Sequence, residues 1–136
     1  MRQQGRLARM QALEVEHDVR ADAVVVHVRG DVDSMSVDTL NTHLAKARMN
    51  ALGHDGHLVL IDLSGVTYFG SAALTAVLSC HEDGLAEGIA VVLVADQPYV
   101  KQPIEITGLD RVLETYPTIE AALRSRGQDP GGRTPR

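Results

Sequence analysis

The chain has 136 residues, which is enough for one compact domain and too few for two. Its hydrophobic fraction of 44% excludes wholesale disorder, and an aromatic fraction of 3% without tryptophan argues against a base-stacking nucleic-acid surface. The formal net charge is -5, but seven arginines lie near the two ends and leave a body of about -11 between Ala12 and Leu123. Such a body repels nucleic acid and anionic lipid and favours a partner with a basic face.

Targeting and redox features are sparse in this sequence. No stretch approaches the ~18 apolar residues of a membrane span, and the first ten residues lack the apolar core of a secretory signal. Cys80 is the only cysteine, so no internal disulfide can form and the chain suits a reducing compartment. These features predict a cytoplasmic protein.

The first third of the chain predicts a hairpin followed by a helix. Apolar and acidic residues alternate over residues 13–19, which is typical of an edge strand with one wet face. A second strand over residues 24–28 ends at Gly30. Apolar residues at steps of three and four then predict a helix over residues 37–51, with Ser36 as its N-cap.

Two unbroken apolar runs, residues 58–61 and 89–94, predict strands that are covered on both faces. The helix between them begins near Ser71 and ends at Gly84 or Gly88. The apolar face predicted for it consists of Leu74, Val77, Leu78 and Leu85. Two successive strand–helix–strand crossovers imply three parallel strands.

The last third predicts a short helix over residues 99–107, an extended piece over residues 113–116 and a final helix capped by Thr118. The fold class is therefore α/β, with a mixed sheet of about five strands, parallel inner strands and about four helices. We predict one domain over residues 12–126, a flexible basic tail over residues 1–11 and a disordered tail over residues 127–136.

Function in an open parallel sheet collects at the carboxyl ends of the strands. Two segments reach that edge here, residues 30–34 and residues 62–71. Ser71 would lie at a helix N-terminus, where free backbone N–H groups favour an anion such as phosphate. Its alternative role is that of a helix cap, which is worth about 1 kcal/mol.

Residues 62–74, with the sequence DLSGVTYFGSAAL, resemble the central signature of STAS domains, a family named for sulfate transporters and anti-sigma-factor antagonists. Residues 30–33, with the sequence GDVD, match the preceding loop of that family, and the order of elements matches from about Ala12 to Leu123. The resemblance implies partner switching. In the bacterial antagonists of that family, the unmodified domain binds an anti-sigma factor that is also a serine kinase, the kinase phosphorylates the serine matching Ser71, and a phosphatase resets the switch.

The resemblance implies a phosphorylation site at Ser71 and a contact surface for the anti-sigma factor around it. The residues expected on that surface are Asp31, Asp33, Ser34, Tyr68, Phe69, Gly70, Ala72 and Thr75. We expect a weak homodimer at most, and no nucleic-acid or membrane partner. No cofactor, metal site or catalytic residue is predicted, so the chain is not expected to be an enzyme.

The sequence departs from the family pattern next to the serine. The usual run is Asp-Ser-Ser-Gly, whereas this chain has GSAA over residues 70–73. Gly70 removes a charge beside the acceptor, and Ala73 would crowd a partner backbone that approaches closely. A STAS scaffold or binding module without phosphorylation is therefore an alternative.

Two other classes of protein compete with this interpretation. A phosphorelay receiver would accept phosphate on Asp62 and use Asp31 and Asp33 as magnesium ligands, but the opening hairpin and the scarcity of lysines oppose it. A serine hydrolase needs glycines two positions either side of its serine, where this chain has Phe69 and Ala73.

Overall fold

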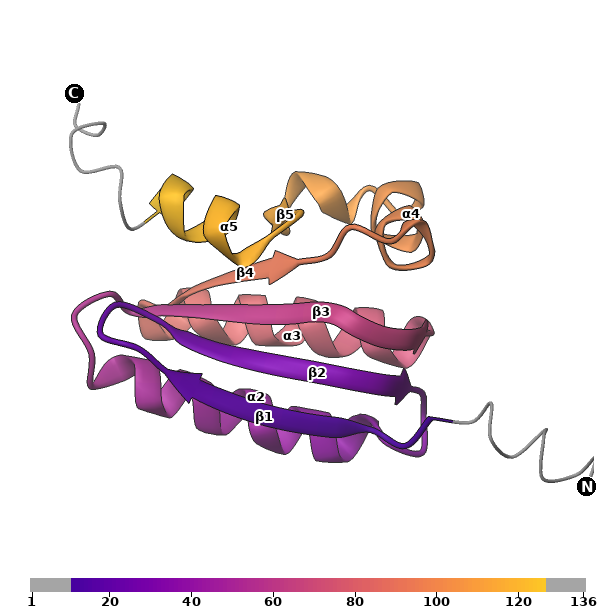
Figure 1. The fold of residues 1–136 in the computed structure, drawn as a ribbon, viewed down its shortest axis with the longest axis horizontal. Coiled ribbons are helices and arrows are strands. Elements are labelled where there is room, and N and C mark those ends of the chain that lie inside the picture. The colour runs from indigo at the N-terminus through magenta and orange to yellow at the C-terminus, as the bar shows by residue number, and fades with distance from the viewer. Residues whose placement is uncertain (1–10, 127–136) are drawn as a thin grey trace, which may run out of the picture.

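The computed structural model describes residues 11–126 (Figure 1). Both predicted tails, residues 1–11 and 127–136, fall outside the described residues, with the exception of Gln11. All helices and strands of the described part lie between Glu14 and Arg126.

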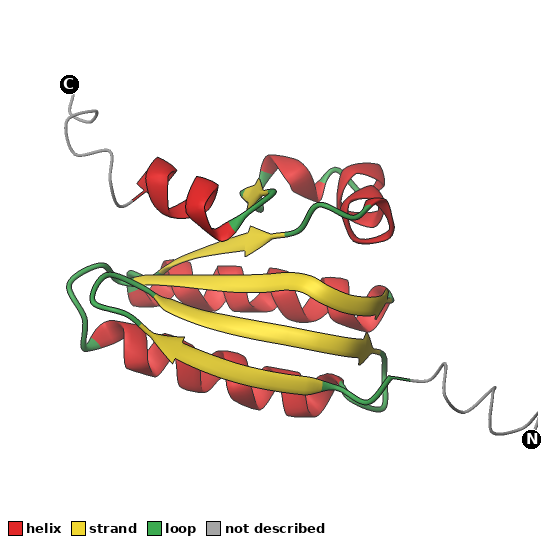
Figure 2. Ribbon diagram, in the orientation of Figure 1, coloured by secondary structure: helices red, strands yellow, loops and turns green. Residues whose placement is uncertain are grey.

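A five-stranded mixed sheet forms the centre of the domain (Figure 2). Strands β1 (Glu14–Val19) and β2 (Val24–Val32) form the predicted antiparallel hairpin. Strand β2 runs parallel to β3 (Leu58–Phe69), which is followed in the sheet by β4 (Ala90–Val94) and β5 (Thr115–Tyr116), also parallel. The strand order β1-β2-β3-β4-β5 confirms the predicted mixed sheet with parallel inner strands.

The helices cover the two faces of the sheet unequally. Helices α2 (Val37–Leu52) and α3 (Ser71–Glu87) lie side by side against one face (Figure 1). Helix α4 (Pro98–Ile106) follows β4 and packs beside β3, and α5 (Ile119–Arg126) packs on the opposite face of the sheet. These four α-helices agree with the prediction, and a single 3-10 turn, Leu109–Arg111, follows α4.

Two apolar clusters fill the space on either side of the sheet. Because strand side chains alternate, Val59 and Ile61 join the large cluster under α2 and α3, whereas Leu60 joins a smaller cluster with Ala122 of α5. All three strand residues have no exposed surface. The unbroken apolar run of β3 thus reflects a strand that is covered on both faces, as predicted.

Strands β2 and β3 are longer than predicted. The sequence predicted loops beginning at Gly30 and at Asp62, but both residues lie within strands. Gly30 sits within β2 at a φ of 93°, beside two shifts in the register with β3. A Cβ atom on Gly30 would overlap the carbonyl oxygen of Ala12, so the backbone at Ala12 approaches too closely for a side chain. Gly30 therefore marks a break in the strand register and not the end of the strand. Strand β3 continues to Phe69 by burying Leu63, Val66 and Phe69.

The apolar face predicted for α3 is partly wrong. Leu85 is 67% exposed, and the helix packs through smaller side chains. The buried positions of α3 are Ala73, Ala76, Val77, Cys80 and Gly84. A Cβ atom on Gly84 would lie 2.7 Å from the carbonyl oxygen of Ile89, so this end of the helix approaches the chain backbone too closely for any side chain.

Leu60→Ala is expected to lower the free energy of unfolding by about 2–5 kcal/mol, because it leaves a cavity between β3 and α5. Urea unfolding followed by circular dichroism measures this. Leu85→Ala is the matched control, and it should change the stability by less than about 0.5 kcal/mol because that side chain is exposed. Equal losses for the two variants would contradict the assignment of the core.

The stability of the domain should also fall in mild acid, because two histidines meet between β1 and α2. Nε2 of His17 lies 2.9 Å from Nδ1 of His43. Burial, His43 and Lys46 together lower the pKa of His17. The folded state therefore binds fewer protons than the unfolded state as the pH falls through about 6.5, and protonation favours unfolding.

Unfolding curves recorded between pH 8 and pH 5 test this prediction. His17→Gln should flatten the acid side of the stability profile, whereas His54→Gln, which changes a histidine outside the pair, should leave it as in the wild type. A wild-type slope that persists in His17→Gln would show that other groups cause it.

Candidate functional site

The predicted site lies where β2 and β3 end side by side. Asp31 pairs with Tyr68 and Val32 with Phe69 across the two strands. The backbone N–H of Gly70 donates to the carbonyl oxygen of Val32 at 3.4 Å, which holds the start of α3 against the end of β2. The two segments that the sequence placed at this edge are therefore neighbours in space.

Ser71 is the exposed first residue of α3. The N-cap position belongs to Gly70, whose carbonyl oxygen accepts the N–H of Leu74 at 3.1 Å, so the alternative in which Ser71 caps the helix is wrong. No hydrogen bond of the Ser71 hydroxyl is present within residues 11–126. The hydroxyl is thus free for chemistry at a helix N-terminus that favours negative charge.

Asp31 ties three chain segments together beneath the site. Its Oδ1 accepts the hydroxyl of Thr67 at 2.6 Å, and its Oδ2 lies 3.3 Å from the backbone nitrogen of Gln11. The backbone N–H of Asp31 also donates to the carbonyl oxygen of Gln11 at 2.9 Å. Asp31 remains half-buried, so its carboxylate contributes negative charge to the edge while it anchors β3.

Asp33 organises the turn that leads into α2. Its Oδ1 accepts the backbone N–H groups of Met35 at 2.9 Å and of Ser36 at 3.1 Å. Ser36 is the N-cap residue, as predicted, although its side chain makes no capping hydrogen bond, and the Asp33 carboxylate holds the turn before it. Ser34, between them, is exposed.

The remaining predicted contact residues divide between surface and core. Tyr68 is 53% exposed and Thr75 is exposed, while Gly70 and Ala72 are half-buried. Phe69 is only 7% exposed, and its side chain packs in the large core cluster and not on the surface. Its expected place on the contact surface is therefore wrong, because the alternation of β3 turns its side chain inward.

Ala73 was expected to crowd a partner, and this is wrong. The residue has no exposed surface and faces the sheet from α3. Helical geometry turns it about 200° from Ser71, at about 100° per residue, so a partner at Ser71 does not meet it.

The site contains two residues that the sequence analysis missed. Gln97 donates from Nε2 to the carbonyl oxygens of Leu63 at 2.9 Å and Val66 at 3.3 Å. The hydroxyl of Tyr99 donates to the same Val66 oxygen at 2.9 Å. Pairing of β3 with β4 stops at Asp62, so these side chains replace the missing ladder along the part of β3 that leads to Ser71.

Asp62 does not have the surroundings of a phosphate acceptor. It is 8% exposed, its Oδ2 lies 2.8 Å from Nδ1 of His27, and its Oδ1 accepts the hydroxyl of Ser64 at 2.7 Å. Asp62 pairs with His27 across the two strands, whereas Asp31 lies four residues beyond His27 on β2, about 13 Å further along at the usual strand rise. The three acids of the receiver alternative therefore do not meet.

A groove of about 490 Å³ separates α2 from α3 next to the site. Ala72 and Thr75 line it near Ser71, and Arg48 closes it further along with an ion pair of 2.9 Å to Glu87. Cys80 also lies here, and burial raises the pKa of its thiol against the opposing effect of Arg48. The thiol therefore stays protonated at neutral pH and is a weak nucleophile.

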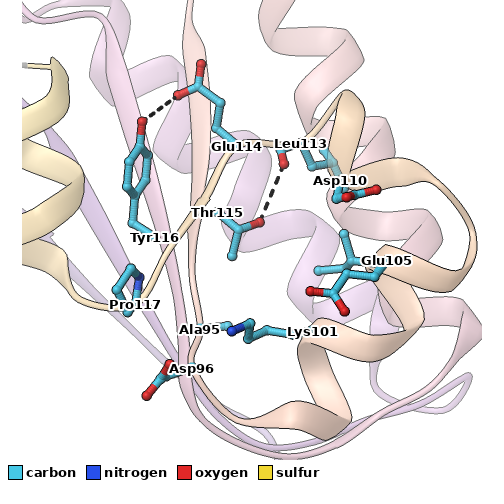
Figure 3. Close-up of a pocket in the computed structure, with 11 residues that line it drawn as sticks. Ala95, Asp96, Lys101, Glu105, Asp110, Leu113, Glu114, Thr115, Tyr116 and Pro117 are labelled. Carbon is cyan, nitrogen blue, oxygen red and sulfur yellow. Dashed lines mark hydrogen bonds between the residues drawn. The ribbon is translucent and has the colours of Figure 1, made fainter.

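A separate cavity of about 320 Å³ lies between α4 and β5 (Figure 3). Acidic side chains and Lys101 line it, and none of the predicted site residues does. The acids are Asp96, Glu105, Asp110 and Glu114. This cavity and the Ser71 edge are two distinct features of the surface.

Comparisons with known proteins agree with this geometry. The model of the STAS domain family matches residues 13–122. A Mycobacterium tuberculosis protein named "Putative anti-anti-sigma factor Rv2638" is 30% identical over 118 residues, which cover 82% of this chain and 74% of that protein. The anti-sigma-F factor antagonist RsfA of the same species is 28% identical over 101 residues, which cover 74% of this chain and 77% of RsfA.

A solved structure has the same fold as this chain. The crystal structure of an anti-sigma factor antagonist from Mycobacterium paratuberculosis superimposes with a TM-score of 0.76 at 26% identity. The superposition covers 85% of this chain and 94% of the other. In addition, no helix among residues 11–126 combines the length and the apolar character needed to cross a membrane.

Gln97→Ala is expected to cost about 1–3 kcal/mol of stability, because it leaves the part-buried carbonyl oxygen of Leu63 without its side-chain donor, whereas Val66 keeps Tyr99. Amide hydrogen exchange should rise over residues 63–69 and stay unchanged over residues 58–62, which pair with both neighbouring strands. Gln102→Ala, an exposed position on α4, is the control. Identical exchange in the two variants would rule out the bracing role of Gln97.

Proposed function

Because this chain belongs to the STAS domain family, we propose that it is an anti-sigma-factor antagonist that binds an anti-sigma factor through the edge around Ser71. The relatives named above support the choice of partner. The observation that carries the proposal is the exposed Ser71 hydroxyl, which makes no capping hydrogen bond at the start of α3. The acidic body of the domain suits a partner with a basic face.

The proposed switch is phosphorylation of Ser71 by the same anti-sigma factor, acting as a serine kinase. A phosphate adds a charge of about -1.5 to -2 within a surface that already holds Asp31 and Asp33. An unpaired charge in an interface costs about 2–5 kcal/mol, which lowers affinity by roughly 30-fold to several thousand-fold. That factor is sufficient to exchange one partner for another, and a phosphatase would restore binding.

A second candidate is a STAS module that binds its partner without being modified. It is favoured by Gly70, which leaves the position before the serine without the acid that is usual in the family. Both candidates use the same surface, and they differ only in the response of the complex to charge at Ser71.

The two candidates are separated by binding measurements with the purified anti-sigma factors of the source organism. Ser71→Ala should fold normally and keep the wild-type affinity, whereas Ser71→Asp should weaken binding at least tenfold. Ala86→Asp is the matched control, because it adds the same charge at an exposed position of α3 about 22 Å further along the helix. Incubation of the complex with ATP should add one phosphate, which mass spectrometry would locate at Ser71.

Equal affinities of the wild type and Ser71→Asp, together with no phosphate transfer, would discard the switch and leave the unmodified binding module. Loss of folding in Ser71→Ala would show that the serine is structural. Absence of binding to every anti-sigma factor would reject the antagonist function itself.

A further inference from the structure

The backbone of Gly70 does not itself require a glycine. Its φ of -91° and ψ of -172° are extended values that any residue adopts. Serine, aspartate and asparagine are all preferred over glycine or equal to it at an N-cap, so the helix does not demand a glycine either. A neighbouring side chain, however, occupies the space beside this position.

That group is the ring of Tyr68. A Cβ atom added to Gly70 would lie 2.9 Å from both the hydroxyl oxygen and Cε2 of Tyr68, and 3.1 Å from Cζ. Real Cβ atoms do not approach other atoms so closely, so the ring occupies the space in which a side chain at position 70 would begin. Tyr68 nevertheless keeps 53% of its surface exposed, immediately before the start of α3.

An acidic residue is the strand partner of Tyr68. Asp31 lies opposite Tyr68 on β2, and its carboxylate is held by Thr67 at 2.6 Å. An exposed aromatic side chain whose strand partner is an acid suits a planar cation, because guanidinium can stack on a ring and also pair with a carboxylate. An ammonium group matches this arrangement less well, since it is compact and strongly hydrated.

Resting on the antagonist function proposed above, we propose that Tyr68, laid over Gly70, is a specificity-determining residue of this surface and receives an arginine side chain of the anti-sigma factor. Gly70 keeps the ring in place by leaving room for it. A side chain at position 70 would displace the ring and alter the partner surface without touching the core, because the displaced atoms are the free end of an exposed side chain.

Calorimetric titration of an anti-sigma factor into variants of the full chain tests the proposal. Tyr68→Phe retains the aromatic face and should bind within about twofold of the wild type. Tyr68→Leu retains apolar bulk without an aromatic face and should bind about 3- to 30-fold more weakly. Wild-type affinity of Tyr68→Leu would overturn the proposal, and so would equal losses for Tyr68→Phe and Tyr68→Leu.

Gly70→Ala examines the role of the glycine through a double-mutant cycle with Tyr68→Ala. Gly70→Ala should weaken binding when Tyr68 is present and have no further effect when Tyr68 has been replaced. Equal losses in both backgrounds would overturn the proposed dependence of the ring on Gly70. Circular dichroism of each variant confirms that the domain is folded before binding is compared.

The outcome also separates this proposal from the antagonist function on which it rests. If the wild type binds no anti-sigma factor, both proposals fall. If the wild type binds and Tyr68→Leu binds equally well, only the role of Tyr68 falls, and the antagonist function stands.

Discussion

Helices cover both faces of strand β3, and the arrangement of the domain depends on the burial of this strand. Val59 and Ile61 face α2 and α3, whereas Leu60 faces α5. Because backbone groups in such a position have no access to water, the strand must pair with β2 and β4 along its buried part. The strand then delivers its carboxyl end, and with it Ser71, to a defined place on the surface.

The buried carboxylate of β3 finds its hydrogen-bond partners among nearby side chains. Asp62 is buried, yet both of its oxygens have partners, at His27 and at Ser64. A buried carboxylate without such partners would be costly, so this network is part of the architecture. The free polar chemistry of the edge is left to groups at its surface, the Ser71 hydroxyl above all.

Much of the fold could be predicted from the sequence, because it rests on local periodicity. The alternating edge strand and the unbroken inner strands predicted the correct sheet, and the helical pattern after β3 placed Ser71 at a helix start. The errors arose where tertiary contacts decide. Gly30 resembled a strand end because its close approach to Ala12 leaves no local mark. Phe69 was expected on the surface because a loop was predicted from Asp62. Strand β3 instead continues to Phe69 and buries its side chain.

The same limit explains why Gln97 and Tyr99 were missed. Both bind carbonyl oxygens of residues more than thirty positions earlier in the chain. A bond from a side chain to a distant backbone oxygen imposes no period and no motif, so a single sequence does not reveal it. The position of Ser71 was predictable, whereas the support beneath it required coordinates.

This support has a consequence for how such domains diverge. The buried half of β3 is held by two strand ladders, but the half that leads to Ser71 has a ladder on one side only and two side chains from the region of α4 on the other. Substitutions in that region can therefore reposition the recognition edge while the hydrophobic core keeps its sequence. Duplicated copies in one genome can therefore acquire separate partners through a few changes at the start of α4, and every intermediate sequence would still fold.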